Sequence, residues 1–207
     1  MALKAIAINC TLKRSGVEPS STDKMIDLIA GKLAKHQVEL VETIRLADFN
    51  VLPGVRSDEG DGDDWPDIRK KALAADILIL GTPIWMGQMS SIAKRVTERM
   101  DAFLGETDKA GRTPAFGKVA VAAIVGNEDG AHHITATLFQ ALNDVGWTIP
   151  AAGSCYWVGE AMQSTDFKDL KTVPKVIRDT ASILASNAAH LAAMLKADPY
   201  GGMKGAK

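Results

Sequence analysis

The hydrophobic positions of this chain form short unbroken runs, separated by longer stretches with helical spacing. Five runs predict strands, at residues 4–9, 38–46, 77–80, 118–125 and 148–158. The run at 77–80 follows Asp76 and is too short for a helix and too continuous for a half-exposed strand. Such a run is typical of a strand that is covered on both faces, as in a parallel sheet.

Between and after these runs, apolar residues recur every three or four positions, which predicts helices with one buried face. These helices are expected after Ser20, after Asp64, from Met89, after His133 and from Pro174. Strands that alternate with helices predict one α/β domain with a doubly wound, five-stranded parallel sheet and helices on both faces. We expect this domain to span residues 1–198, with a disordered tail at 199–207.

The amino-acid composition weighs against several classes of protein. The 207 residues carry 24 Lys and Arg against 25 Asp and Glu, so no basic field is available for nucleic acid or an anionic membrane. No apolar stretch approaches the ~20 residues of a membrane span. The only cysteines, Cys10 and Cys155, are too few and too far apart for a disulfide framework, which favours a reducing, cytoplasmic location.

The first candidate loop joins the first strand to the first helix. The hydroxyls of Thr11, Ser20, Ser21 and Thr22, the ammonium of Lys13 and the free amides of the helix start would suit a phosphate. A purely structural helix cap is the alternative. The loop lacks the glycine patterns of dinucleotide folds and of nucleotide triphosphatases, so a tightly held NAD or ATP is not indicated.

The second candidate loop, residues 81–88, follows the third strand. Trp85 and Met86 carry apolar surface that is unusual for an exposed turn. Either they fold back onto the protein, or they form a wall for a flat aromatic ligand whose polar edge bonds to the glycine-containing backbone. The loop alone favours neither interpretation.

The third candidate loop, residues 126–133, follows the fourth strand, and its sequence is GNEDGAHH. One interpretation is a ligand loop at the same sheet edge as the other two. A second interpretation, compatible with the first, is a glycine-bounded turn whose acids cap the next helix. The adjacent histidines have no third ligand at usable spacing, so we discount a metal. Tyr156 and Trp157 follow near the same edge, where ligand contact, subunit contact and core packing are all open.

The connection at 47–64 is long and rich in Gly and Asp. A calcium loop is conceivable, but the glutamate expected at its end is missing, so a solvated acidic turn is favoured. Asp64, followed by Pro66, is predicted to cap the next helix.

These three loops together resemble the flavodoxin-like NAD(P)H-dependent FMN reductases. The segments that carry the resemblance are GTPIWMGQMSSIAKRVTERMD, NCTLK followed by SST, and GNEDGAHH. Ser21 departs mildly from the family, where asparagine is frequent. Iron–sulfur relatives carry a cysteine cluster between the second and third strands, and this chain has none there. The resemblance implies the strand order 2-1-3-4-5 and bound FMN.

The residues implied to hold the flavin come from all three loops. They are Thr11, Lys13, Ser20, Ser21, Thr22, Thr82, Pro83, Ile84, Trp85, Met86, Gly87, Gly126, Asn127, Glu128, Asp129, Gly130 and His133. His133 is also the one candidate for a catalytic role, stabilising charge on the reduced flavin, while the flavin itself carries the chemistry.

The expected function is an FMN-dependent oxidoreductase that takes electrons from NAD(P)H and passes them in two-electron steps to a quinone, free flavin or other small acceptor. The resemblance also implies a homodimer or homotetramer. The alternative is a flavodoxin-type electron carrier or flavin-binding module, although the near-neutral charge weighs against a carrier. A receiver domain is excluded because Asn9, Cys10 and Thr11 stand where it needs carboxylates.

Overall fold

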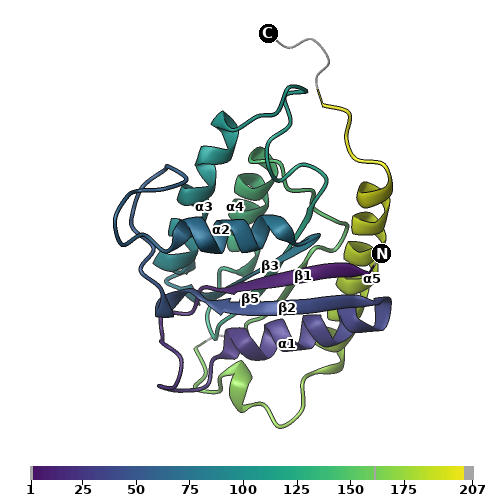
Figure 1. Cartoon of the computed structure of the whole chain (residues 1–207). Helices are drawn as coiled ribbons and strands as arrows, with labels where there is room; N and C mark the ends of the chain where they lie inside the picture. The colour runs from purple at the N-terminus through teal and green to yellow at the C-terminus, as the bar shows by residue number, and fades with distance from the viewer. Residues whose placement is uncertain (1, 161, 203–207) are drawn as a thin grey trace.

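The computed structural model describes residues 2–160 and 162–202, and a parallel sheet forms its centre (Figure 1). Its strands run in the order β2-β1-β3-β5-β6. Their bounds are β1 (Leu3–Asn9), β2 (Val38–Arg45), β3 (Ile77–Trp85), β5 (Val119–Val125) and β6 (Ser154–Trp157). This is the predicted doubly wound order, because the short β4 (Gln88–Met89) only extends β3 as an antiparallel hairpin.

Helices cover both faces of the sheet, as predicted (Figure 1). One face carries α1 (Ser21–Leu33) and α5 (Lys175–Ala197). The other carries α2 (Trp65–Ala74), α3 (Ser91–Met100) and α4 (Ala131–Asp144). Short 3-10 turns lie at Ala34–His36, Leu46–Asp48, Asp101–Gly105 and Phe167–Asp169.

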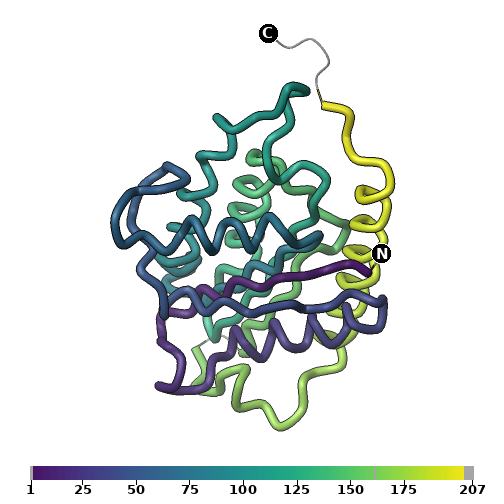
Figure 2. The backbone as a smooth tube through the Cα atoms, viewed as in Figure 1, coloured from purple at the N-terminus to yellow at the C-terminus, as the bar shows by residue number. Residues whose placement is uncertain are grey.

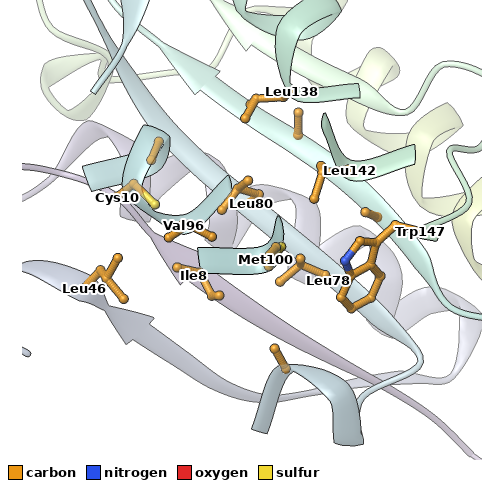
Figure 3. Close-up of a cluster of buried hydrophobic side chains, with 14 of the residues drawn as sticks. Ile8, Cys10, Leu46, Leu78, Leu80, Val96, Met100, Leu138, Leu142 and Trp147 are labelled. Atoms are coloured by element: carbon orange, nitrogen blue, oxygen red, sulfur yellow. The ribbon is translucent and has the colours of Figure 1, made fainter. Parts of the chain in front are cut away.

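The two hydrophobic cores follow from the alternation of side chains along each strand. Ile6 and Ile8 of β1 pack toward α2, α3 and α4, whereas Ala5 and Ala7 face α1 and α5. Figure 3 shows the first core, with side chains from the sheet between those of the helices. Its labelled members include Ile8, Leu46, Leu78, Leu80, Val96, Met100, Leu138, Leu142 and Trp147.

The end of β3 differs from the expected loop at 81–88. The strand continues through Trp85, and β4 returns along it with Ile84 opposite Met89 and Trp85 opposite Gln88. Met86 and Gly87 form the two-residue turn and both have positive φ, at 52° and 75°. Two-residue hairpins need such backbone angles, because their twist then matches that of the strands.

The long acidic connection is fixed to α3 rather than solvated along its whole length. The carboxylate of Asp63 accepts a 2.7 Å hydrogen bond from the guanidinium of Arg99, and both side chains are fully buried. Arg99 also donates to the carbonyl oxygens of Leu52 and Arg56, at 2.8 and 2.9 Å. The prediction of a wholly solvated turn is therefore wrong at Asp63.

Two further expectations change at helix ends. Asp64 does not cap α2 with its side chain, because that carboxylate accepts the backbone N–H of Asn50 at 2.7 Å. The helix expected from Met89 begins at Ser91, since the hydroxyl of Ser90 accepts the N–H of Ala93 and caps it.

The predicted tail is described only as far as residue 202, and residues 203–207 lie outside the described part. Within the described part, the ring of Tyr200 packs edge-on against that of Phe116, with centroids 6.0 Å apart. The Tyr200 hydroxyl accepts a 3.3 Å hydrogen bond from Thr148.

Candidate functional site

The carboxyl-terminal ends of β1, β3 and β5 meet at one edge of the sheet, where their loops and the segment after β6 line a cleft. Its volume of about 120 Å³ is smaller than the ~300–1,000 Å³ of complete ligand pockets. The lining residues are Thr11, Leu12, Lys13, Pro19, Ser20, Ser21, Thr22, Pro83, Ile84, Trp85, Val125, Gly126, Asn127, Glu128, Asp166 and Lys168.

The side chain of Asn9 holds the first loop in place through hydrogen bonds. This last residue of β1 is fully buried, and its side-chain oxygen accepts the N–H of Thr11 at 2.9 Å. Its amide donates to the hydroxyl of Ser20 at 3.5 Å and to the carboxylate of Asp23. A polar residue that ends an apolar strand is the sequence signal that could have identified Asn9.

The first loop brings all five of its predicted residues to the cleft, at the start of α1. Ser20 caps the helix by accepting the N–H of Asp23 at 3.3 Å, so the structural interpretation of this residue is confirmed. Ser21 and Thr22 begin the helix, where N–H groups lack intrahelical partners and attract anions. Lys13 lines the same end and forms an ion pair with Glu18.

The second loop places Pro83, Ile84 and Trp85 on the cleft. Trp85 is 50% exposed, so it is not part of the core. Thr82 is fully buried, and its hydroxyl accepts the N–H of Ser90 at 3.1 Å. Thr82 therefore connects the hairpin to α3 and does not reach the cleft, and neither Met86 nor Gly87 is among the lining residues.

The third loop contributes Gly126, Asn127 and Glu128 to the cleft. The carboxylate of Glu128 accepts the backbone N–H of Met86 at 3.0 Å and so joins this loop to the hairpin of the second. Asp129 and Gly130 are not among the lining residues.

Glycines allow the second and third loops to approach each other closely. A Cβ atom on Gly130 would lie 2.6 Å from the carbonyl oxygen of Gly87, and one on Gly126 would lie 2.8 Å from the Cβ of Ile84. Side chains at these two positions would separate the loops. The predicted convergence of the two loops is thus explained by the absence of side-chain atoms.

The two histidines at the start of α4 each have a different partner. His133 Nε2 lies 3.0 Å from Gln88 Oε1, which ties α4 to the hairpin. His132 Nε2 lies 2.8 Å from the hydroxyl of Tyr156. His133 is exposed and is not among the residues that line the cleft. Within the described residues, no group of three His, Cys, Asp or Glu side chains could hold a metal ion.

The two aromatic residues at the end of β6, Tyr156 and Trp157, lie in different environments. Trp157 is buried and packs against Phe167 with ring centroids 5.6 Å apart, so core packing is the correct interpretation for it. Tyr156 lies at the surface of the other core beside His132.

Burial excludes the two thiols from nucleophilic chemistry. Desolvation raises the pKa of Cys155 to about 12 and also raises the pKa of Cys10. Both cysteines are therefore protonated at neutral pH and poor nucleophiles.

Sequence reasoning missed Leu12, Pro19, Val125, Asp166 and Lys168. The first three are neighbours of predicted residues. Asp166 and Lys168 belong to the segment after β6, and no motif marks them. Only their position beyond the end of a parallel strand indicates that they could reach the site.

Comparison with known proteins identifies relatives along most of the chain. The family described as NADPH-dependent FMN reductase matches residues 3–162. A Streptomyces davaonensis protein named 8-demethyl-8-aminoriboflavin-5'-phosphate synthase is 33% identical over 217 residues, which cover 97% of this chain and 81% of that protein. A Mycobacterium bovis protein named divalent metal cation transporter MntH is 34% identical over 202 residues.

The match to the mycobacterial protein covers 94% of this chain but only 29% of that protein, so this chain corresponds to less than a third of its length. Within residues 2–160 and 162–202, every helix is too short or too polar to serve as a transmembrane span.

Solved structures agree with the family match. The crystal structure of RosB with bound 8-demethyl-8-formylriboflavin-5'-phosphate has a TM-score of 0.85 and 30% identity, covering 97% of this chain and 82% of that chain. An NADH:FMN oxidoreductase, EmoB, has a TM-score of 0.62 and 20% identity, covering 98% and 95%. At that identity, the likeness to EmoB shows a shared fold and nothing further.

Proposed function

The chain belongs to the NADPH-dependent FMN reductase family, and from this membership we propose that its cleft binds FMN and that the protein passes electrons from NAD(P)H to a small acceptor. The observation that carries the proposal is the chemical asymmetry of the cleft. One end has hydroxyls, a helix start and two lysines, and the other end has the exposed indole of Trp85.

The first end suits the phosphate of FMN. Ser21 and Thr22 offer hydroxyls and backbone N–H groups at the start of α1, and Thr11, whose backbone N–H donates to Asn9, adds a third hydroxyl. These donors are fixed before a ligand arrives, which lowers the entropic cost of binding. Lys13 and Lys168 add positive charge beside them.

The other end suits a flat ring. Trp85 supplies an aromatic surface, and the neighbouring loop lines the cleft with Gly126, Asn127 and Glu128, which carry polar groups. Glu128 and the close contact between Gly87 and Gly130 hold these two loops together. When bound, FMN would supply the hydride chemistry, so the protein itself has to bind the ring, orient it and leave one face open.

Turnover by the purified protein tests the proposal against the electron-carrier alternative. The oxidation of NADPH and of NADH would be followed in the presence of FMN and a quinone or free flavin. Sustained oxidation that requires FMN and the protein supports a reductase and gives the nicotinamide preference. Tight FMN binding without sustained oxidation would instead support a carrier or binding module.

A second function is supported by the relatives. The Streptomyces protein is named as a synthase of a modified riboflavin phosphate, and RosB was crystallised with a flavin phosphate described as an intermediate. In this second proposal, the flavin phosphate is a substrate of the chain and not a resident cofactor. Mass spectrometry of the flavin recovered after turnover separates the two, because a cofactor keeps the mass of FMN and a substrate does not.

We also infer a cytoplasmic location and a homodimer or homotetramer. Two buried free thiols are typical of proteins from reducing compartments, and the family resemblance supports the oligomer. Light scattering on the purified protein would measure the oligomeric state.

A further inference from the structure

The turn at residues 166–170, which follows β6, is fixed against the start of α1. The N–H of Lys168 donates a 3.1 Å hydrogen bond to the hydroxyl of Ser21. The ammonium of Lys24 donates to the carbonyl oxygens of Lys168 and Leu170, at 3.1 and 2.7 Å. Figure 2 shows this segment, in light green, alongside the purple α1.

Phe167 connects the same turn to the hydrophobic core. Phe167 is buried and packs against Trp157, and the ammonium of Lys24 lies 5.6 Å from the centre of the Phe167 ring. The backbone of the turn is therefore held in place by contacts on both sides of Lys168. A side chain on such a turn has a defined position relative to the helix start.

Lys168 and Asp166 extend from this turn to the cleft, at the end lined by Ser21 and Thr22. The ammonium of Lys168 is paired with Asp166 and lies 3.5 Å from Asp169. Its side chain is only 19% exposed. The hydrogen bond that the ammonium donates to Asp166 raises the pKa of Lys168, so the ammonium stays charged at neutral pH.

The other lysine that lines the cleft has a similar arrangement, since Lys13 is paired with Glu18. Both ammonium groups at this end thus already have a carboxylate partner. An incoming phosphate has to replace these carboxylates or share the ammonium groups with them. Like charges at close range are unfavourable, so each carboxylate opposes the binding of an anion.

We propose that Lys168 is a phosphate ligand of the bound flavin and that Asp166 is its internal competitor, which the phosphate displaces. This inference rests on the proposed function, because it assumes that a flavin phosphate occupies the cleft. A phosphate monoester carries a charge of about −1.5 to −2 at neutral pH against −1 for a carboxylate, which favours the exchange. The remaining repulsion from Asp166 makes the flavin phosphate easier to release.

The experiment compares FMN with riboflavin, which lacks the phosphate, by titration of the full chain and its variants. Lys168→Gln is expected to weaken FMN by ~10-fold or more, because a charge-assisted hydrogen bond is lost, and to leave riboflavin within about twofold. Asp166→Asn is expected to tighten FMN severalfold and again to leave riboflavin unchanged. Lys171→Gln is the control, because Lys171 is exposed three residues further along.

The outcomes separate this inference from the proposed function. If the wild type prefers FMN to riboflavin and Lys168→Gln keeps that preference, the inference is wrong while flavin binding stands. An Asp166→Asn variant that binds FMN more weakly would also overturn it, because Asp166 would then position Lys168 and not compete for it. If the wild type binds neither flavin, the proposed function itself fails.

Discussion

The buried pair of Asp63 and Arg99 gives a quantitative stability prediction, with Asp63→Asn as the perturbation. One carboxylate oxygen accepts from Arg99 and from the N–H of Glu59, and the other accepts from the N–H groups of Leu52 and Trp65. Asparagine has nearly the same shape, but its NH₂ group would face donors at one of these two positions. The substitution therefore removes a charge and leaves buried donors unpaired.

The magnitude follows from the pKa of Asp63. Burial alone would raise it, but the hydrogen bonds from Arg99 and the three N–H groups outweigh burial and lower the pKa from 3.8 to about 2. A difference of this size corresponds to roughly 2.5 kcal/mol of stability. Breaking one side of a buried ion pair costs about 3 to 5 kcal/mol, so we expect a loss of roughly 2 to 4 kcal/mol. At ~2–4 °C per kcal/mol, the melting temperature falls by roughly 5 to 15 °C.

The pH dependence gives the sharper test. Because the folded-state pKa lies below the unfolded value, the charged carboxylate stabilises the protein above about pH 5 and loses this effect as the pH falls toward about 2. Thermal or urea unfolding should show the largest gap between wild type and Asp63→Asn near neutral pH, and a smaller gap in acid. Asp61→Asn, on the exposed part of the same connection, should match the wild type. A large gap that is independent of pH would refute the electrostatic explanation.

Three further predictions concern the cleft. Trp85→Ala should weaken FMN binding by about 1 kcal/mol or somewhat more in a titration and leave the melting temperature nearly unchanged. Normal FMN binding with a lowered melting temperature would mean that the indole belongs to the core. Gly130→Ala should weaken FMN more than it lowers stability, because φ is +130° and the new methyl group would meet Gly87; unchanged affinity would show that the loops need not touch. His133→Ala should slow NADPH oxidation more than it weakens FMN, and Gln88→Ala should reproduce this effect if His133 acts by positioning the hairpin; wild-type turnover in both would exclude that role.

The sequence predicts the sheet and the convergence of three loops because both follow from local patterns. Apolar runs identify the buried strands, and parallel strands bring the loops that follow them to one edge. The hairpin after Trp85 escapes prediction because Met86 adopts positive φ without the Asn-Gly signal. The burial of Asp63 and the place of Lys168 depend on contacts with residues 36 and 147 positions away, which no local pattern encodes.

The first loop of the cleft is fixed by residues that are synthesised much later than the loop itself. The N–H of Cys10 donates to the carbonyl oxygen of Gly81 at 2.8 Å, and the hydroxyl of Ser90 donates to the carbonyl oxygen of Cys10 at 2.7 Å. A ribosome adds ~5–20 residues per second, so the loop after β1 waits several seconds for these partners. During that interval the residues of α1 and β2 have been synthesised, but the loop lacks the partners that fix it. A nascent chain therefore cannot fix the first loop of the cleft until β3 and the start of α3 have left the ribosome.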